Sequence, residues 1–126
     1  MTYKIVIGGC RNFTNYRLFS EYVDLCLARL KRQGDICILS GNCAGADALG
    51  ERYALEHGYA IELYPADWET YGKSAGPIRN REMVKNADAV IAFWDGTSAG
   101  TASLISFAKR LNKPLRVKKI KKDGSF

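Results

Sequence analysis

The chain has 126 residues, 47% of them hydrophobic and 25% charged, which suits one globular domain with a hydrophobic core. No apolar run approaches the ~18 residues of a membrane span, and the start lacks the features of a secretory signal, so we expect a cytoplasmic protein with no membrane partner. The net charge is +6, concentrated near the C-terminus, and the four cysteines and one histidine lack the spacing of a metal site.

Strand patterns and helix patterns alternate along the whole chain. Short apolar runs predict buried strands, and apolar residues three and four positions apart predict helices with one buried face. In chain order the pattern gives a strand at 3–8, a helix at about 15–31, a strand at 36–39, a helix at about 46–57, a strand at 60–64, a long polar and aromatic loop at 65–76, a helix from 77 to about 85, a strand at 87–94, a helix at 102–111 and a strand that begins at 114–117.

This alternation predicts right-handed βαβ units and a parallel sheet. We predict a three-layer, Rossmann-like α/β fold with about five parallel strands in the order 3-2-1-4-5 and helices on both faces. The domain would occupy residues 1–117, followed by a basic C-terminal tail at 118–126. In such a sheet, ligands bind beyond the carboxyl ends of the strands, where the strand order reverses. That point lies between the first and fourth strands.

Three loops at that edge, 8–11, 40–47 and 95–101, are rich in glycine and in polar side chains. Glycine lets the backbone approach a ligand, an arginine fork matches a phosphate or carboxylate, and a helix N-terminus favours an anion. None of the loops matches a dinucleotide or P-loop fingerprint. From these loops we take as candidate ligand-binding residues Gly9, Arg11, Ser40, Gly41, Gly45, Asp47, Asp95, Ser98, Gly100 and Thr101.

The stretch 65–83 is the richest in polar and aromatic side chains. Long loops rich in polar and aromatic side chains more often have a function than serve only as connections, and an aromatic ring there could stack on a base. Packing under the loop is the alternative interpretation of Trp68 and Tyr71. The candidates from this stretch are Asp67, Trp68, Lys73, Arg79 and Asn80.

Together these motifs resemble the YspA-like, cpYpsA-related branch of the SLOG superfamily, which joins the Smf/DprA DNA-processing proteins with the LOG-type phosphoribohydrolases. The resemblance rests on residues 9–13, 40–47, 65–68, 72–80 and 92–101. It implies a Rossmann-like fold and a pocket for a nucleotide or nucleotide-derived ligand. In LOG-type enzymes a catalytic glutamate follows the glycine-rich turn, whereas Ala102, Ser103 and Leu104 follow Gly100-Thr101 here.

We therefore expect the protein to bind or sense a small, phosphate-bearing nucleotide-type ligand, for example one like ADP-ribose. One alternative is hydrolysis of the N-glycosidic bond of nucleoside monophosphates, which needs a carboxylate beside the ribose. Asp47 and Glu82 are the candidate catalytic acids for that reaction. A second alternative is binding of DNA or RNA through the basic tail. The sequence is compatible with both a monomer and a homo-oligomer.

Overall fold

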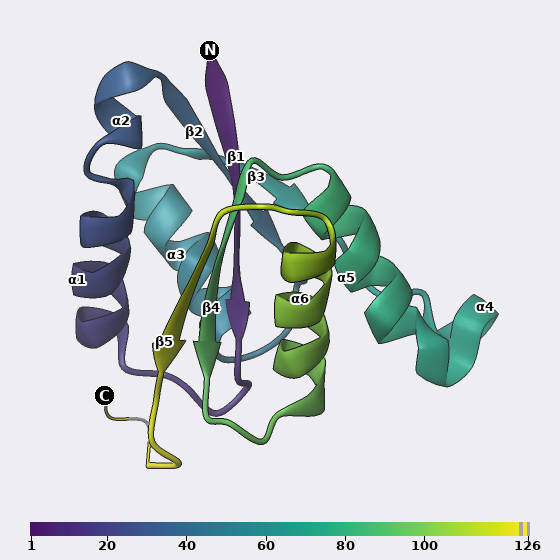
Figure 1. The fold of residues 1–126 in the computed structure, drawn as a ribbon. Coiled ribbons are helices and arrows are strands. Elements are labelled where there is room, and N and C mark those ends of the chain that lie inside the picture. Colours follow the sequence, from purple (N-terminus) through teal and green to yellow (C-terminus); the bar gives the residue numbers. More distant parts are fainter. Residues whose placement is uncertain (124, 126) are drawn as a thin grey trace.

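The strands form one parallel sheet at the centre of the molecule (Figure 1). In the computed structural model, which describes residues 1–123 and 125, the strands lie in the order β3-β2-β1-β4-β5, and all neighbours pair in parallel. The predicted fold class and strand order are thus confirmed. The strands are β1 (Thr2–Gly9), β2 (Asp35–Ser40), β3 (Ala60–Leu63), β4 (Ala89–Trp94) and β5 (Leu115–Lys119).

Helices cover both faces of the sheet (Figure 1). Successive strand residues point to opposite faces, so Ile5 and Ile7 of β1 join one hydrophobic cluster while Val6 joins the other. The first cluster includes residues of α1 (Tyr16–Leu27) and α3 (Ala46–His57), and the second includes residues of α5 (Ala75–Lys85) and α6 (Ala99–Arg110). Burial of each large apolar side chain contributes roughly 1.5–3 kcal/mol, so both layers hold the sheet in place.

Two predicted element boundaries are wrong in an informative way. The helix predicted at about 15–31 is interrupted after α1, and a short α2 (Leu30–Gln33) follows a turn. The predicted loop at 65–76 contains α4 (Trp68–Tyr71) and the 3-10 helix η1 (Gly72–Ser74), which leads directly into α5. The Asp67 carboxylate caps α4 by accepting a hydrogen bond from the Thr70 N–H at 3.1 Å.

The segment predicted as a basic tail begins inside the sheet. Lys118 and Lys119 complete β5, and their ammonium groups lie over the rings of Tyr22 and Trp94 respectively. Ile120 is only 2% exposed, and its N–H donates to the Trp94 carbonyl at 2.9 Å. The folded domain therefore extends at least to Ile120.

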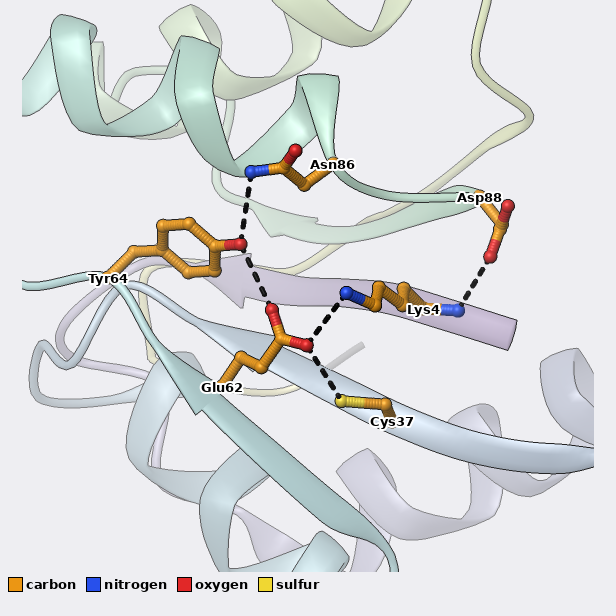
Figure 2. A network of polar contacts seen from close by, with 6 residues as sticks. All are labelled: Lys4, Cys37, Glu62, Tyr64, Asn86 and Asp88. Carbon is orange, nitrogen blue, oxygen red and sulfur yellow. Dashed lines mark hydrogen bonds and ion pairs between the residues drawn. The ribbon is translucent and has the colours of Figure 1, made fainter. Parts of the chain in front are cut away.

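A polar network ties three strands to the end of α5 on the face that α5 and α6 cover (Figure 2). The Glu62 carboxylate on β3 accepts from Lys4 Nζ at 2.9 Å, from the Tyr64 hydroxyl at 3.1 Å and from the Cys37 thiol at 3.7 Å. The Tyr64 hydroxyl in turn accepts from Asn86 Nδ2 at 3.2 Å. Because the Lys4–Glu62 pair is partly exposed, it adds little stability, and the network mainly fixes how β3 lies against α5.

Candidate functional site

A pocket of about 400 Å³ opens beyond the carboxyl ends of β1 and β4, at the point where the strand order reverses. This is the place that the fold predicts for a ligand. Its walls come from the loop after β1, the loop after β2, the first turns of α5 and the turn that starts α6. The lining residues are Gly8, Gly9, Cys10, Arg11, Asn12, Cys43, Asp47, Arg79, Asn80, Met83, Asp95, Ser98, Gly100, Thr101 and Leu104.

Two glycines allow the loops around the pocket to lie this close together. Gly9 has φ +154°, and a Cβ there would lie 2.2 Å from the Phe93 carbonyl oxygen on β4. Gly45 has φ +75°, and a Cβ there would lie 2.3 Å from the Cys10 carbonyl oxygen. Any larger residue would therefore combine a strained backbone with a collision against the neighbouring main chain. The glycine-rich sequence is thus needed to form the pocket itself.

Asp47, in the first turn of α3, presents a carboxylate to the pocket although its residue is only 7% exposed. Its two oxygens accept hydrogen bonds from the N–H groups of Gly9 at 3.3 Å and Cys43 at 3.4 Å. Burial raises the pKa of Asp47 to about 6, against the opposing effects of the Arg79 charge and of these two N–H donors. The group is therefore able to gain and lose a proton just below neutral pH.

Arg79 joins the separate parts of the site. Its Nη1 donates to the Gly41 carbonyl at 2.6 Å and to the Tyr64 carbonyl at 3.4 Å, which links α5 to the ends of β2 and β3. Its Nε donates to the Asn80 side-chain oxygen at 2.9 Å. The Asn80 amide then donates to the Gly100 carbonyl at 3.2 Å, so the same pair also holds the start of α6. Arg79 acts here chiefly as a positioning residue.

The turn before α6 is fixed by hydrogen bonds to its own side chains. Asp95 Oδ1 accepts from the N–H groups of Thr97 and Ser98, both at 2.9 Å, and these two bonds lower the pKa of Asp95 to about 2. Ser98 caps the helix by accepting from the Thr101 N–H. The N–H groups of Ala99 and Gly100 belong to the first helical turn, which has no acceptors within the helix. They are available to a ligand, and the helix dipole favours an anion there.

Cysteine sulfurs lie on two sides of the pocket. Cys10 is buried, its sulfur contacts Thr101 Oγ1 at 4.0 Å, and burial raises the pKa of its thiol. The Cys43 sulfur accepts long contacts from Arg11 Nη2 at 4.0 Å and from Arg79 Nη1 at 3.9 Å. All four cysteines are free thiols. No group of three or more histidine, cysteine, aspartate or glutamate side chains within residues 1–123 and 125 could hold a metal ion.

Most of the predicted ligand-binding residues do line the pocket. Gly9, Arg11, Asp47, Arg79, Asn80, Asp95, Ser98, Gly100 and Thr101 are brought together as the loop positions suggested. Ser40, Gly41 and Gly45 lie behind the lining: the Ser40 hydroxyl donates to the Glu51 carboxylate at 2.7 Å, and the Gly41 carbonyl binds Arg79.

Four other predicted residues are outside the lining. Asp67 caps α4, and Lys73 belongs to η1. Trp68 is 53% exposed on α4, which lies beyond the N-terminal end of α5 and away from the sheet (Figure 1). Glu82 is exposed on α5.

Sequence reasoning missed several lining residues. Met83 and Leu104 follow Arg79 and Gly100 by four positions, so each stands one helical turn further along the same face. That spacing is a signal that could have found them. Gly8, Cys10, Asn12 and Cys43 are neighbours of predicted residues within the same loops.

Sequence similarity links the chain to a known protein family and to a phage protein. The chain matches the YspA, cpYpsA-related SLOG family over residues 3–71, which is more than half of its length. The Gene 61 protein of Mycobacterium phage D29 is 37% identical over 86 residues, covering 64% of this chain and 69% of that protein.

A solved structure shares the fold. DNA processing protein A from Helicobacter pylori, studied for its single-stranded DNA binding mode, has a TM-score of 0.65 and 24% sequence identity. The similarity covers 91% of this chain but only 64% of that one. At this identity, the likeness establishes the fold alone. No helix of the described residues is long and apolar enough to cross a membrane.

Proposed function

The chain belongs to the YspA, cpYpsA-related SLOG family, and from that premise we propose that its pocket binds a phosphate-bearing, nucleotide-derived small molecule. Family membership indicates the nucleotide-derived class of ligand. The pocket volume of about 400 Å³ falls within the range of small-molecule sites. The proposal concerns binding or sensing of that ligand at the carboxyl edge of the sheet.

One observation carries the proposal: the free end of α6, a guanidinium and a buried carboxylate face the same pocket. The N–H group of Gly100 supplies a donor to a phosphate, and Arg11 adds a positive charge at the exposed rim. Asp47 supplies an acceptor at the floor of the same space. One part of the pocket thus favours an anion and another part favours hydrogen-bond donors, which suits a ligand that carries both a phosphate and hydroxyl groups.

Gly100→Ala tests the phosphate position without damaging the fold. A Cβ at Gly100 would meet no atom within 4 Å, and it would tilt toward the N-terminus of α6, where the phosphate is expected. Gly76→Ala is a matched control, because it adds a methyl group to the first turn of α5, outside the lining, at an ordinary contact distance of 3.5 Å. Both variants should fold, and a glycine-to-alanine change in a helix adds roughly 0.5–1 kcal/mol of stability.

Isothermal titration calorimetry with AMP, ADP and ADP-ribose provides the readout. We expect at least one of these ligands to bind the wild type, with affinity reduced ~10-fold or more in Gly100→Ala and unchanged in Gly76→Ala. Equal affinities in the two variants would place the phosphate elsewhere. No binding of any nucleotide at millimolar concentration would refute the proposal.

A second candidate function is hydrolysis of an N-glycosidic bond, and one observation favours it. Two carboxyl groups line the pocket with pKa values far apart: burial raises that of Asp47 to about 6, and backbone N–H groups hold that of Asp95 at about 2. Such separation is typical of an acid paired with an ionised stabiliser. Glu82 lies outside the lining, so Asp95 takes its place in this candidate pair.

In this reaction water adds to C1′ of the ribose and the base leaves with a proton. As the bond from C1′ to the base nitrogen breaks, Asp47 would donate the proton to the base and then recover one from the attacking water, while ionised Asp95 would stabilise positive charge on the sugar ring. Chromatography of each nucleoside monophosphate after incubation tests the candidate. Release of free base that is abolished in Asp47→Asn and in Asp95→Asn would support hydrolysis, whereas a bound but intact nucleotide would leave binding as the function.

A further inference from the structure

We infer, resting on the proposed function, that the pocket recognises the ribose phosphate of its ligand and is indifferent to the base. It follows from what the lining side chains and main-chain groups can and cannot bind.

The donors of the pocket gather on two of its walls. The N–H group of Gly100 lies in the first turn of α6, and Arg11 follows β1 across the same space. Neighbouring donors are already occupied: the Thr101 N–H bonds to Ser98, and the Cys10 N–H bonds to the Phe93 carbonyl at 3.1 Å. The remaining donors are suited to one anionic group at the α6 end of the pocket.

The acceptors of the pocket are two carboxylates, which would repel a second phosphate. Asp47 lies at the floor with both oxygens held by long N–H bonds of 3.3 and 3.4 Å. On Asp95, Oδ1 accepts both backbone N–H bonds of the turn. A carboxylate accepts as many as four hydrogen bonds, so both groups keep acceptor capacity. Their chemical complement is a set of hydroxyl donors beside a phosphate, which is what a ribose 5-phosphate presents.

The described lining offers little that would select a base. It contains no aromatic ring, and its larger apolar side chains are Met83 and Leu104. The Asn80 amide, which could read the edge of a base, is committed to Arg79 and to the Gly100 carbonyl. Trp68 and Tyr71 are 53% and 50% exposed on α4 and take no part in the lining. The described lining therefore has no ring on which a base could stack, and its other amide, that of Asn12, belongs to an exposed residue.

A series of ligands tests the inference on the full wild-type chain. The probes are ribose 5-phosphate, AMP, GMP, CMP, UMP and 2′,3′-dideoxy-AMP, titrated by calorimetry at pH 7.5, where Asp47 is ionised. We expect the four nucleotides to bind within about threefold of one another and ribose 5-phosphate within about tenfold of AMP. The dideoxy compound lacks both hydroxyls and should bind ~10-fold or more weakly than AMP.

The Asp47→Asn variant adds a check on the hydroxyl contact. The difference between AMP and 2′,3′-dideoxy-AMP should shrink by about threefold or more in this variant, because a neutral acceptor binds a hydroxyl less strongly than a carboxylate does. Glu82→Gln, an exposed change outside the lining, should preserve the difference.

The outcomes separate this inference from the proposed function. A preference of about thirtyfold or more for one base, or binding of AMP without binding of ribose 5-phosphate, would overturn base indifference and leave nucleotide binding intact. Equal binding of AMP and its dideoxy analogue would overturn recognition of the hydroxyls. If neither ribose 5-phosphate nor any nucleotide binds, the proposed function fails and this inference fails with it.

Discussion

Replacement of Asp47 by asparagine should raise the free energy of unfolding above that of the wild type, and this gain should be larger at neutral pH than at acid pH. Burial moves the pKa of the Asp47 carboxyl in the folded protein from 3.8 to about 6. Between these two values the folded state holds a proton that the unfolded state has released, so the free energy of unfolding of the wild type falls as the pH rises. At about 1.4 kcal/mol for each pH unit, the loss amounts to ~3 kcal/mol by pH 7. Asparagine does not titrate and escapes this loss.

Urea unfolding followed by tryptophan fluorescence measures the effect at several pH values from 4 to 8. Groups common to both proteins cancel in the difference, which should shift in favour of Asp47→Asn by ~2 kcal/mol between pH 4 and pH 7. Asp95→Asn is a control whose difference from the wild type should stay nearly constant over this pH range. Its lowered pKa stabilises the folded wild type above pH 3.8, and this contribution is lost as the pH falls toward 2. If the difference in free energy of unfolding between Asp47→Asn and the wild type did not change with pH, or changed in the opposite direction, burial would not be destabilising the ionised carboxylate.

Four further changes test how the pocket and the domain are built. Gly45→Ala should lower the free energy of unfolding by ~3 kcal/mol or more in a urea titration, because the new Cβ would meet the Cys10 carbonyl; Gly58→Ala, at φ +70° in open space, should cost only ~1 kcal/mol. Equal losses would show that the backbone angle alone matters. Ile120→Ala should lower the melting temperature through a loss of roughly 2–5 kcal/mol, whereas deletion of residues 122–126 should have little effect. An unchanged melting temperature in Ile120→Ala would show that this residue does not belong to the folded core.

Much of the fold could be predicted because short apolar runs alternate with helical patterns. The strand order follows from right-handed crossovers, and the predicted bounds of α3 agree with the structure because Gly58 ends that helix in a left-handed conformation. The short helix α4 was missed because it has four residues and no apolar periodicity. Its signal was local, in the capping side chain of Asp67.

The candidate site was predictable at the level of loops and less so at the level of side chains. The sequence places the glycine-rich loops at one edge, since parallel strands end together. It does not reveal that Arg79 is occupied by main-chain carbonyls, or that α4 carries Trp68 away from the pocket. The contacts of Arg79 and the position of Trp68 both depend on how the segment after β3 packs against α5. The residue pattern within one helix or strand does not determine that packing.

The most direct test of nucleotide binding at the carboxyl edge of the sheet is an NMR titration of the isotopically labelled protein with AMP. The amide signals of Gly9, Arg11, Gly100 and Thr101, which surround the pocket, should move together and saturate in the low millimolar range or below. Shifts confined to β5, to α4 or to another surface, or no shifts at all, would contradict the assignment of this pocket as the ligand site.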